Sequence, residues 1–302
     1  MSSAEETAEE SDVVVCNNCG VAEVDEIKLK SKDCDGGDLV KYCSDKCMEE
    51  HREQHEEECK KRGQELHDNK LFKQPERSHR GECPLCFLPM PLRSKNSSFY
   101  SCCSIVVCNG CEHAHYKSNG GQSCPFCREP RADKKESDKR VMNRVKANDP
   151  AAMSVMGLKL YYEGDCDTAF RYLTKAAQFG DIEAHYNLGV MYRDGEGVEK
   201  DEEKKVYHYE KAAIGGHPYA RHNLGCAEHK NGNFDRSVKH YIIAANLGFE
   251  DSMKELWKHY SAGNITKEDL ESTLRAHKAA IDAMKSRQRE AAEKFWIWKD
   301  SR

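Results

Sequence analysis

The sequence lacks long apolar runs and is poor in proline. Only 38% of its 302 residues are hydrophobic, 33% are charged and eight are proline. A helix that spans a bilayer needs about 20 consecutive apolar residues, and the runs in this chain are far shorter. We therefore expect no membrane-embedded segment.

An excess of positive charge is also lacking. The formal net charge is −5 and the isoelectric point is near 6.3. Because phosphate binding requires a basic face, this balance argues against a nucleic-acid partner. The first twelve residues are acidic and have neither the basic nor the apolar part of a secretory signal. We expect an intracellular protein, cytoplasmic or nuclear, with a disordered acidic tail over residues 1–12.

Cysteine, by contrast, is abundant and concentrated in the first half. Fourteen of the sixteen cysteines lie between Cys16 and Cys127, mostly as pairs two or three residues apart. In a reducing compartment, clustered cysteines are more often metal ligands than disulfides. Two segments with few large apolar residues, 13–60 and 81–130, are thus predicted to fold around zinc. The two remaining cysteines, Cys166 and Cys226, are expected to be packing residues.

The first block, residues 13–60, contains one set of candidate ligands. These are Cys16, Cys19, Cys34, Cys43, Cys47, His55 and Cys59. Short-spaced pairs supply two donors of a tetrahedron, and a helix would place His55 and Cys59 on one face. A structural zinc supplies on the order of 10–16 kcal/mol, enough to fold a segment with so small a core.

This spacing resembles a MYND zinc finger. The resemblance implies that Cys16, Cys19, Cys43 and Cys47 hold one zinc, and that Cys34, His55 and Cys59 hold part of a second. The chain departs from the family where a fourth cysteine is expected, at Gly37. The missing ligand could be replaced by Asp35, Asp38, His51 or water. Alternatively, this second zinc site is weak or empty.

The second block, residues 81–130, follows a polar linker at 61–80 that is predicted to be a short helix ended by Pro75. Its candidate ligands form four pairs: Cys83 and Cys86, Cys102 and Cys103, Cys108 and Cys111, Cys124 and Cys127. Eight sulfurs suffice for two tetrahedral sites. The segment resembles a RING finger, which implies that the first and third pairs bind one zinc and the second and fourth the other. His113 or His115 could replace one sulfur, although we expect both to be spectators.

The RING resemblance implies a ubiquitin ligase that orients a ubiquitin-charged conjugating enzyme without covalent chemistry of its own. Leu85, Pro125 and Arg128 stand at the positions that contact that enzyme. The alternative is a non-catalytic zinc-binding scaffold that mediates protein–protein interactions. On either interpretation we expect three to four zinc ions per chain.

From residue 150 the chain repeats itself. Small residues recur near positions 152, 184, 220 and 252, and a second pair of anchors recurs at 176–177, 212–213, 244–245 and 279–280. Two anchors per unit predict two helices per unit, stacked into an all-α solenoid over residues 150–282. An irregular helical bundle is the alternative, but it does not explain two sets of matched anchors.

These units resemble Sel-one-like repeats, a tetratricopeptide-related family whose implied role is to hold partner proteins, such as a ligase substrate. The charged segment 131–149 is predicted to be a helical connector rather than a nuclear-import signal, because acidic residues interrupt its basic ones. Residues 283–302 are predicted to form a charged helix or tail. Its aromatic residues Phe295, Trp296 and Trp298 are expected to cover the open end of the stack, or else to anchor a partner.

Overall fold

The computed structural model describes residues 30–33, 39–42, 61 and 63–300, with side chains from 61 and from 63 to 296. The chain divides into two compact units, Met1–Leu71 and Phe72–Arg302. Each unit is considered by itself.

The first unit contains a two-stranded antiparallel sheet and a helix. Strand β1 (Lys30–Asp33) pairs with β2 (Leu39–Tyr42), so that Lys30 lies opposite Tyr42 and Asp33 opposite Leu39. Residues 61 and 63–71 are helical, which agrees with the helix predicted for the linker.

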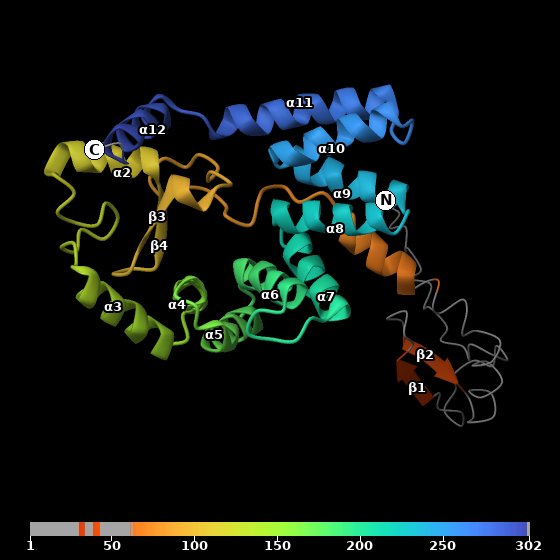
Figure 1. Ribbon diagram of the computed structural model, residues 1–302, viewed down its shortest axis with the longest axis horizontal. Coiled ribbons are helices and arrows are strands. Elements are labelled where there is room, and N and C mark those ends of the chain that lie inside the picture. The colour runs from red at the N-terminus through yellow and green to blue at the C-terminus, as the bar shows by residue number, and fades with distance from the viewer. Residues whose placement is uncertain (1–29, 34–38, 43–60, 62, 301–302) are drawn as a thin grey trace, which may run out of the picture. The chain divides into compact units, whose positions relative to one another are not determined.

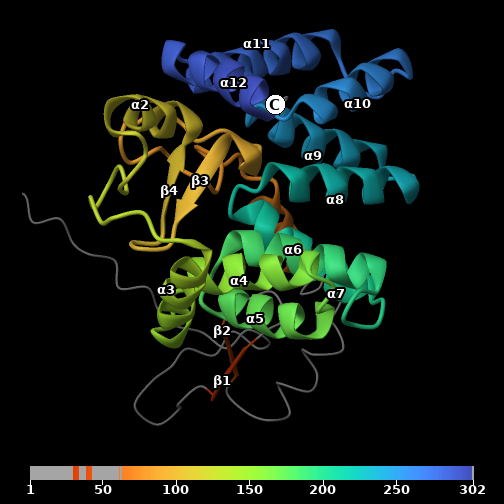
Figure 2. The ribbon, with the colours of Figure 1, turned by 60° about the vertical axis from the view of Figure 1, so that its left-hand side comes forward.

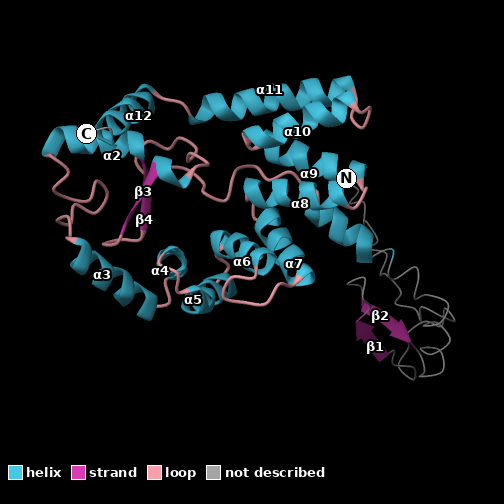
Figure 3. Ribbon diagram, viewed as in Figure 1, coloured by secondary structure: helices cyan, strands magenta, loops and turns pink. Residues whose placement is uncertain are grey.

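The second unit is mainly helical (Figure 3). Its elements are η1 (Ser94–Asn96), β3 (Ser97–Tyr100), β4 (Ile105–Cys108), α2 (Asn109–Asn119), α3 (Lys134–Lys146), α4 (Pro150–Tyr162), α5 (Cys166–Gln178), α6 (Ile182–Asp194), α7 (Glu202–Ile214), α8 (Pro218–Lys230), α9 (Phe234–Asn246), α10 (Glu250–Ser261), α11 (Lys267–Met284) and α12 (Arg287–Asp300). Among the described residues, no helix has both the length and the apolar character needed to cross a membrane.

Helices α4 to α9 form three hairpins, α4/α5, α6/α7 and α8/α9, which stack one after another (Figure 1). The predicted anchors are buried, with Ala152, Ala184 and Ala220 each at 0% exposure. The downstream glycine of each first helix lets a large side chain of the second helix approach its backbone. A Cβ on Gly225 would lie 2.7 Å from the Tyr241 ring, and one on Gly157 would lie 2.8 Å from Leu173. The predicted helical solenoid is confirmed.

Acidic N-caps begin most of these helices. The side chains of Asp149, Asp165, Asp181 and Asp201 each accept a hydrogen bond from the backbone N–H three residues on. Such caps satisfy amide groups that the first turn leaves without an intrahelical partner. The hairpin boundaries are therefore set by local sequence as well as by packing.

The fourth hairpin, α10/α11, differs from the prediction in one respect. We expected Ala279 and Ala280 to be its buried anchors, but Ala279 is exposed. The α11 side chains that face the stack are Leu270, Thr273 and His277. The C-terminal part of α11 lies beside the turn that follows α9, where Ala280 and Met284 are within 4 Å of a Cβ placed on Gly248.

A small module precedes the repeats. Strands β3 and β4 pair antiparallel, with Ser97 opposite Cys108, and α2 follows β4 directly. Its core is formed by Met90, Val107 and three cysteines, Cys83, Cys108 and Cys111. So small a core predicts low stability for this module unless a cross-link or a metal adds to it.

Helices from two distant parts of the chain flank this module. Helix α3 leads from it to α4, and α12 returns from the far end of the repeats to pack on α2 (Figure 2). Phe295 lies 4.7 Å from His113 and 5.6 Å from Tyr116, between ring centroids. The expectation that Phe295 and Trp296 cover the end of the stack is therefore wrong, because these aromatic residues cover α2 instead. The side chain of Trp298, named in the same expectation, lies outside the described ones.

Candidate metal centres

The first and third cysteine pairs meet at one point of the module. The Sγ atoms of Cys83, Cys86, Cys108 and Cys111 all lie within 4.8 Å of one another. Cys83 and Cys111 are 3.9 Å apart, and Cys86 and Cys108 are 3.8 Å apart. A tetrahedral zinc with Zn–S bonds of about 2.3 Å has S···S edges of about 3.8 Å. The sulfur spacing thus fits zinc.

The second and fourth pairs form another group of four. The Sγ atoms of Cys102, Cys103, Cys124 and Cys127 also lie within 4.8 Å of one another. Cys103 and Cys124 are 3.8 Å apart, and Cys102 and Cys127 are 3.4 Å apart. The adjacent cysteines therefore both face one point, 3.9 Å from each other. The structure brings together the same two sets of four that the RING resemblance implies.

The first and fourth cysteine pairs lie in two backbone turns with the same hydrogen-bond pattern. In the first turn, Cys83 N–H donates to Leu88 O at 2.9 Å and Phe87 N–H donates to Cys83 O at 2.8 Å. In the second turn, Cys124 N–H donates to Glu129 O at 2.8 Å, and Arg128 N–H donates to Cys124 O at 3.1 Å. Phe87 and Arg128 have φ values of 56° and 66°, a left-handed conformation that costs non-glycine residues free energy. Metal binding would stabilise both turns.

The thiols differ in how readily they ionise: a hydrogen bond with Cys111 lowers the pKa of Cys108 to about 4, whereas Cys102 and Cys103 resist ionisation. Burial and neighbouring sulfurs raise the pKa of Cys103 to about 11 and also raise the pKa of Cys102. Four thiolates at such distances would repel one another, and a divalent metal removes that repulsion and displaces the thiol protons. The donor set, all sulfur, is one that zinc prefers.

The two histidines of α2 lie outside these groups. His113 is 4% exposed and packs against Phe295. His115 Nε2 lies 3.0 Å from Ser123 O, the carbonyl that precedes Cys124. Neither histidine therefore replaces a sulfur. Cys166 and Cys226 are also outside the groups: Cys166 packs against the first repeat cluster, whereas Cys226 is exposed and its sulfur accepts a hydrogen bond from Tyr241 Oη at 3.3 Å.

An arginine from a flanking helix binds the backbone near each group. Arg144 of α3 donates to Ser101 O at 3.1 Å and to Cys102 O at 2.5 Å. Arg289 of α12 donates to Pro89 O at 2.8 Å and lies 3.6 Å from Cys86 Sγ. Sequence reasoning missed both residues. Their partners are 42 to 203 positions away, and no local spacing signals such a contact.

A third cluster of possible ligands lies between the linker and the repeats. His79 Nε2 is 2.9 Å from Glu183 Oε2, and His217 Nε2 is 3.5 Å from the same oxygen. His217 Nδ1 accepts the N–H of Ala220 at 3.2 Å and so caps α8. A neutral ring with Nδ1 as acceptor carries its proton on Nε2, and a protonated nitrogen cannot ligate a metal. This cluster is a hydrogen-bonded carboxylate, not a metal site.

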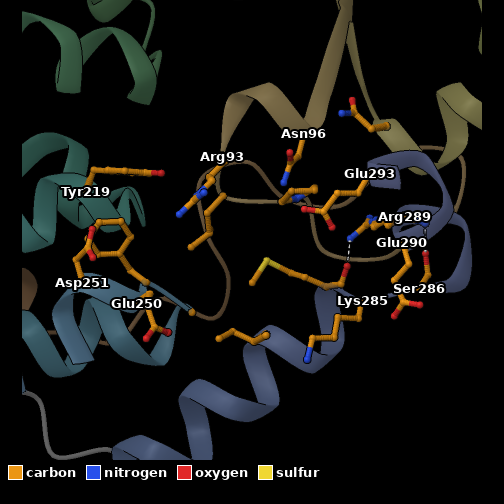
Figure 4. A pocket seen from close by; sticks show the side chains of 17 residues that line it. Arg93, Asn96, Tyr219, Glu250, Asp251, Lys285, Ser286, Arg289, Glu290 and Glu293 are labelled. Carbon is orange, nitrogen blue, oxygen red and sulfur yellow. Dashed lines mark hydrogen bonds between the residues drawn. The ribbon is translucent and has the colours of Figure 1, made fainter. Parts of the chain in front are cut away.

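A cavity of about 430 Å³ lies beside α12 (Figure 4). The loop after the first turn supplies Arg93, α8 supplies Tyr219, and α10 supplies Asp251, while α12 supplies Arg289 and Glu293. Charged and aromatic side chains thus line this cavity, which lies where the module, the last repeats and α12 meet.

The residues predicted to contact a conjugating enzyme differ in exposure. Arg128 is exposed, Leu85 is half-buried against the module core, and Pro125 is buried. The candidate ligands of the first block lie outside the described residues: Cys16, Cys19, Cys34, Cys43, Cys47, His55 and Cys59. The same holds for Gly37 and its alternatives.

Comparison with protein families gives two matches. A MYND finger matches residues 16–59, and a Sel1 repeat matches three consecutive segments, 150–181, 182–217 and 218–249. The predicted MYND-like finger and Sel-one-like repeats are confirmed. The MYND match implies zinc binding by the first block. Residues 81–130 lie outside both matches, so the RING assignment stays a prediction.

Solved structures of repeat proteins are also similar. A Sel1 repeat protein from Oxalobacter formigenes is 24% identical, with 58% of this chain and 74% of that chain covered and a TM-score of 0.43. The protein c5321, a protective antigen of uropathogenic Escherichia coli with an SLR fold, is 19% identical with a TM-score of 0.41. That match covers 61% of this chain and 39% of the antigen.

Proposed function

We propose that this chain is a zinc-dependent scaffold that binds partner proteins through its repeats. The combination of a MYND finger with Sel1 repeats carries the proposal, because Sel1 repeats generally mediate protein–protein interaction. A solenoid offers an extended surface built from successive hairpins. Zinc would serve to fold the two cysteine-rich segments, with three to four ions per chain in an intracellular, reducing compartment.

Exposed aromatic residues of the repeats are the proposed contacts. Trp257 and Tyr260 of α10 are 49% and 38% exposed, and their rings lie 6.2 Å apart. Tyr162 is 82% exposed and Phe179 is 55% exposed. Large aromatic side chains are enriched among the residues that dominate binding energy at protein interfaces.

Substitution of the α10 pair tests this proposal. Tagged wild-type chain and the double variant Trp257→Ala/Tyr260→Ala would be expressed in cells of the source organism, cross-linked and compared by quantitative mass spectrometry. We expect at least one partner whose recovery falls about tenfold in the double variant. The control is Lys254→Ala/Lys258→Ala on the same helix, which should leave recovery unchanged. Equal recovery with both double variants would reject α10 as a binding surface.

A RING-type ubiquitin ligase is the second candidate, and the interleaved pairing of the eight sulfurs favours it. Arg128 and Leu85 would contact a ubiquitin-charged conjugating enzyme, while the buried Pro125 would shape the turn that carries Arg128. The repeats would then recruit the protein substrate.

Ubiquitin transfer in vitro tests the second candidate. Zinc-loaded chain would be incubated with activating enzyme, a panel of conjugating enzymes and ubiquitin. Ubiquitin chains that form with the wild type and with Lys134→Ala, but not with Arg128→Ala, would support ligase activity. No product with any conjugating enzyme, from a sample shown to contain zinc, would leave the scaffold as the function.

A further inference from the structure

We propose that Arg289 couples the docking of helix α12 to metal occupancy of the first four-sulfur group, Cys83, Cys86, Cys108 and Cys111. This inference rests on the proposed zinc binding. It goes beyond zinc binding and the repeats, because it makes the position of the C-terminal helix depend on whether the metal is bound.

The contacts of Arg289 carry the inference. Its Nη2 lies 3.6 Å from Cys86 Sγ and 3.4 Å from Leu88 O, and its Nη1 donates to Pro89 O at 2.8 Å. All three partners belong to the first cysteine turn. The same Nη1 also donates to Met284 O, the last residue of α11, at 2.6 Å (Figure 4). One guanidinium therefore ties the turn to the break between α11 and α12.

The metal matters to this contact because it would hold in place the sulfur and the carbonyl oxygens that Arg289 binds. Four thiolates and one Zn²⁺ leave a net charge of about −2, so a guanidinium beside a ligating sulfur is attracted to it. Hydrogen bonds to charged acceptors are about twice as strong as those between neutral groups. When the metal leaves, the four sulfurs lose the cation that holds them together. The turn also loses the cross-link that holds Leu88 O and Pro89 O in place.

Helix α12 also packs directly on α2. Among its described side chains only Ala292 is fully buried, while Phe295 and Trp296 are partly covered. The backbone of α12 approaches α2 closely at one point, where a Cβ on Gly110 would lie 2.9 Å from Arg289 N and 2.8 Å from Arg289 Cγ. Arg289 adds to this packing a direct contact with the cysteine turn, so the docking of α12 is sensitive to the order of that turn.

The coupling must be reciprocal. If zinc favours the docked helix, the docked helix favours zinc by the same factor. Partners that orient or hydrogen-bond metal ligands typically contribute 10- to 100-fold to metal affinity. Undocking would expose Phe295 together with His113 and Tyr116, the aromatic residues that pack against one another where α12 meets α2.

Hydrogen exchange measured by mass spectrometry tests the docking. Because chelation is expected to unfold α2 as well, the zinc-bound wild type would be compared with zinc-bound Arg289→Gln, with α12 (287–300) and α5 (166–178) as the reporting segments. We expect protection of α12 to be at least tenfold lower in the variant, while protection of α5 stays unchanged. Equal protection of α12 in the two proteins would overturn the inference.

Zinc release measures the reciprocal effect. A chromophoric chelator would follow release over time, and cysteine alkylation would show which group of four has opened. We expect Arg289→Gln to accelerate release from the first group about tenfold and to leave the second group unchanged. Arg287→Gln, an exposed arginine on the same helix, is the matched control. Equal rates for the two variants would contradict the coupling.

A second variant tests the docking of α12 without changing Arg289. Gly110→Leu places a side chain where the α12 backbone lies, and should accelerate release as Arg289→Gln does. In a chain that ends at Met284, and so lacks α12, Gly110→Leu should add nothing. An equal acceleration in the truncated chain would show an effect on the metal turn itself and would refute the role of α12. Absence of zinc from the purified chain would instead refute the proposed zinc binding.

Discussion

Single glycines determine how closely the hairpin helices approach. Gly189, Gly225 and Gly157 each stand where a Cβ would overlap a side chain of the following helix. Alanine in a helix interior is intrinsically about 1 kcal/mol more favourable than glycine. The presence of glycine at these points therefore reflects packing, not helix propensity.

We predict that Gly189→Ala destabilises the second unit by about 1–2 kcal/mol. The added methyl group overlaps the Tyr209 ring, and overpacking typically costs about 1–3 kcal/mol. Urea unfolding followed by circular dichroism would measure the change. A double-mutant cycle with Tyr209→Leu supplies the control: the two substitutions should cost less together than the sum of the single ones. Additive costs would show that the overlap is not the cause.

A buried histidine makes stability depend on pH. Burial lowers the pKa of His217 to about 4, although Glu183 opposes the shift. Burial would raise the pKa of Glu183, but hydrogen bonds from His217 and His79 lower it below its usual value. The neutral ring stacks 4.2 Å from both His79 and Tyr186.

We predict that stability falls between pH 6.5 and pH 4. An unfolded histidine titrates near 6.5, so the contribution of neutral His217 is complete above that pH and is lost as pH falls to about 4. The loss is on the order of 3 kcal/mol. Urea midpoints at pH 7.5 and pH 5 would be compared between the wild type and His217→Asn, which keeps an N-cap. An identical pH dependence in both would contradict this assignment.

At the scale of elements, we expect the module of β3, β4 and α2 to depend on a cross-link, because its apolar core is small. Two short strands and one helix bury few apolar side chains, and both cysteine turns contain a residue with positive φ. The repeats, in contrast, have continuous clusters such as Met153, Leu173, Leu188 and Met191. The two kinds of element should therefore respond differently to loss of metal.

We predict that exhaustive chelation unfolds residues 81–130 and leaves α4 to α9 helical. The reason is that zinc supplies on the order of 10–16 kcal/mol to structural sites, whereas the repeats rely on packing. Hydrogen exchange of 97–119 should become fast, and that of 166–178 should stay slow. If 97–119 kept native protection without metal, zinc would not be its folding agent.

At the scale of the whole molecule, the chain divides after Leu71. Each unit has its own contacts, and the MYND match lies entirely in the first unit. Independent units fold and unfold separately unless a large interface joins them.

We predict that deletion of residues 1–71 leaves the thermal midpoint of the second unit within about 3 °C of its value in the full chain. A shift of 1 kcal/mol moves the midpoint of a domain of this size by about 2–4 °C. Calorimetry of both chains would measure it. Native mass spectrometry should show two zinc ions on the deleted chain and three to four on the full chain. A single zinc on the deleted chain would refute one of its four-sulfur groups.

The sequence by itself determined the features that repeat or that depend on short spacing. Two sets of small residues that recur in successive units predicted the helical hairpins, because close helix crossings tolerate only small side chains. Short spacing predicted the four cysteine pairs, because neighbouring ligands share one turn of chain. Which pairs share a metal was implied only by the RING resemblance. The family matches confirm the finger and the repeats.

Only the tertiary structure decided where the end of the chain lies. The aromatic residues of α12 were expected on the open end of the stack, yet Phe295 packs on α2. Arg289 reaches a turn about 200 residues away, and α11 contacts the stack through Leu270 and His277 instead of Ala279. Such contacts depend on the curvature of the solenoid and on which surface the C-terminal helix reaches. No local pattern of residues predicts either.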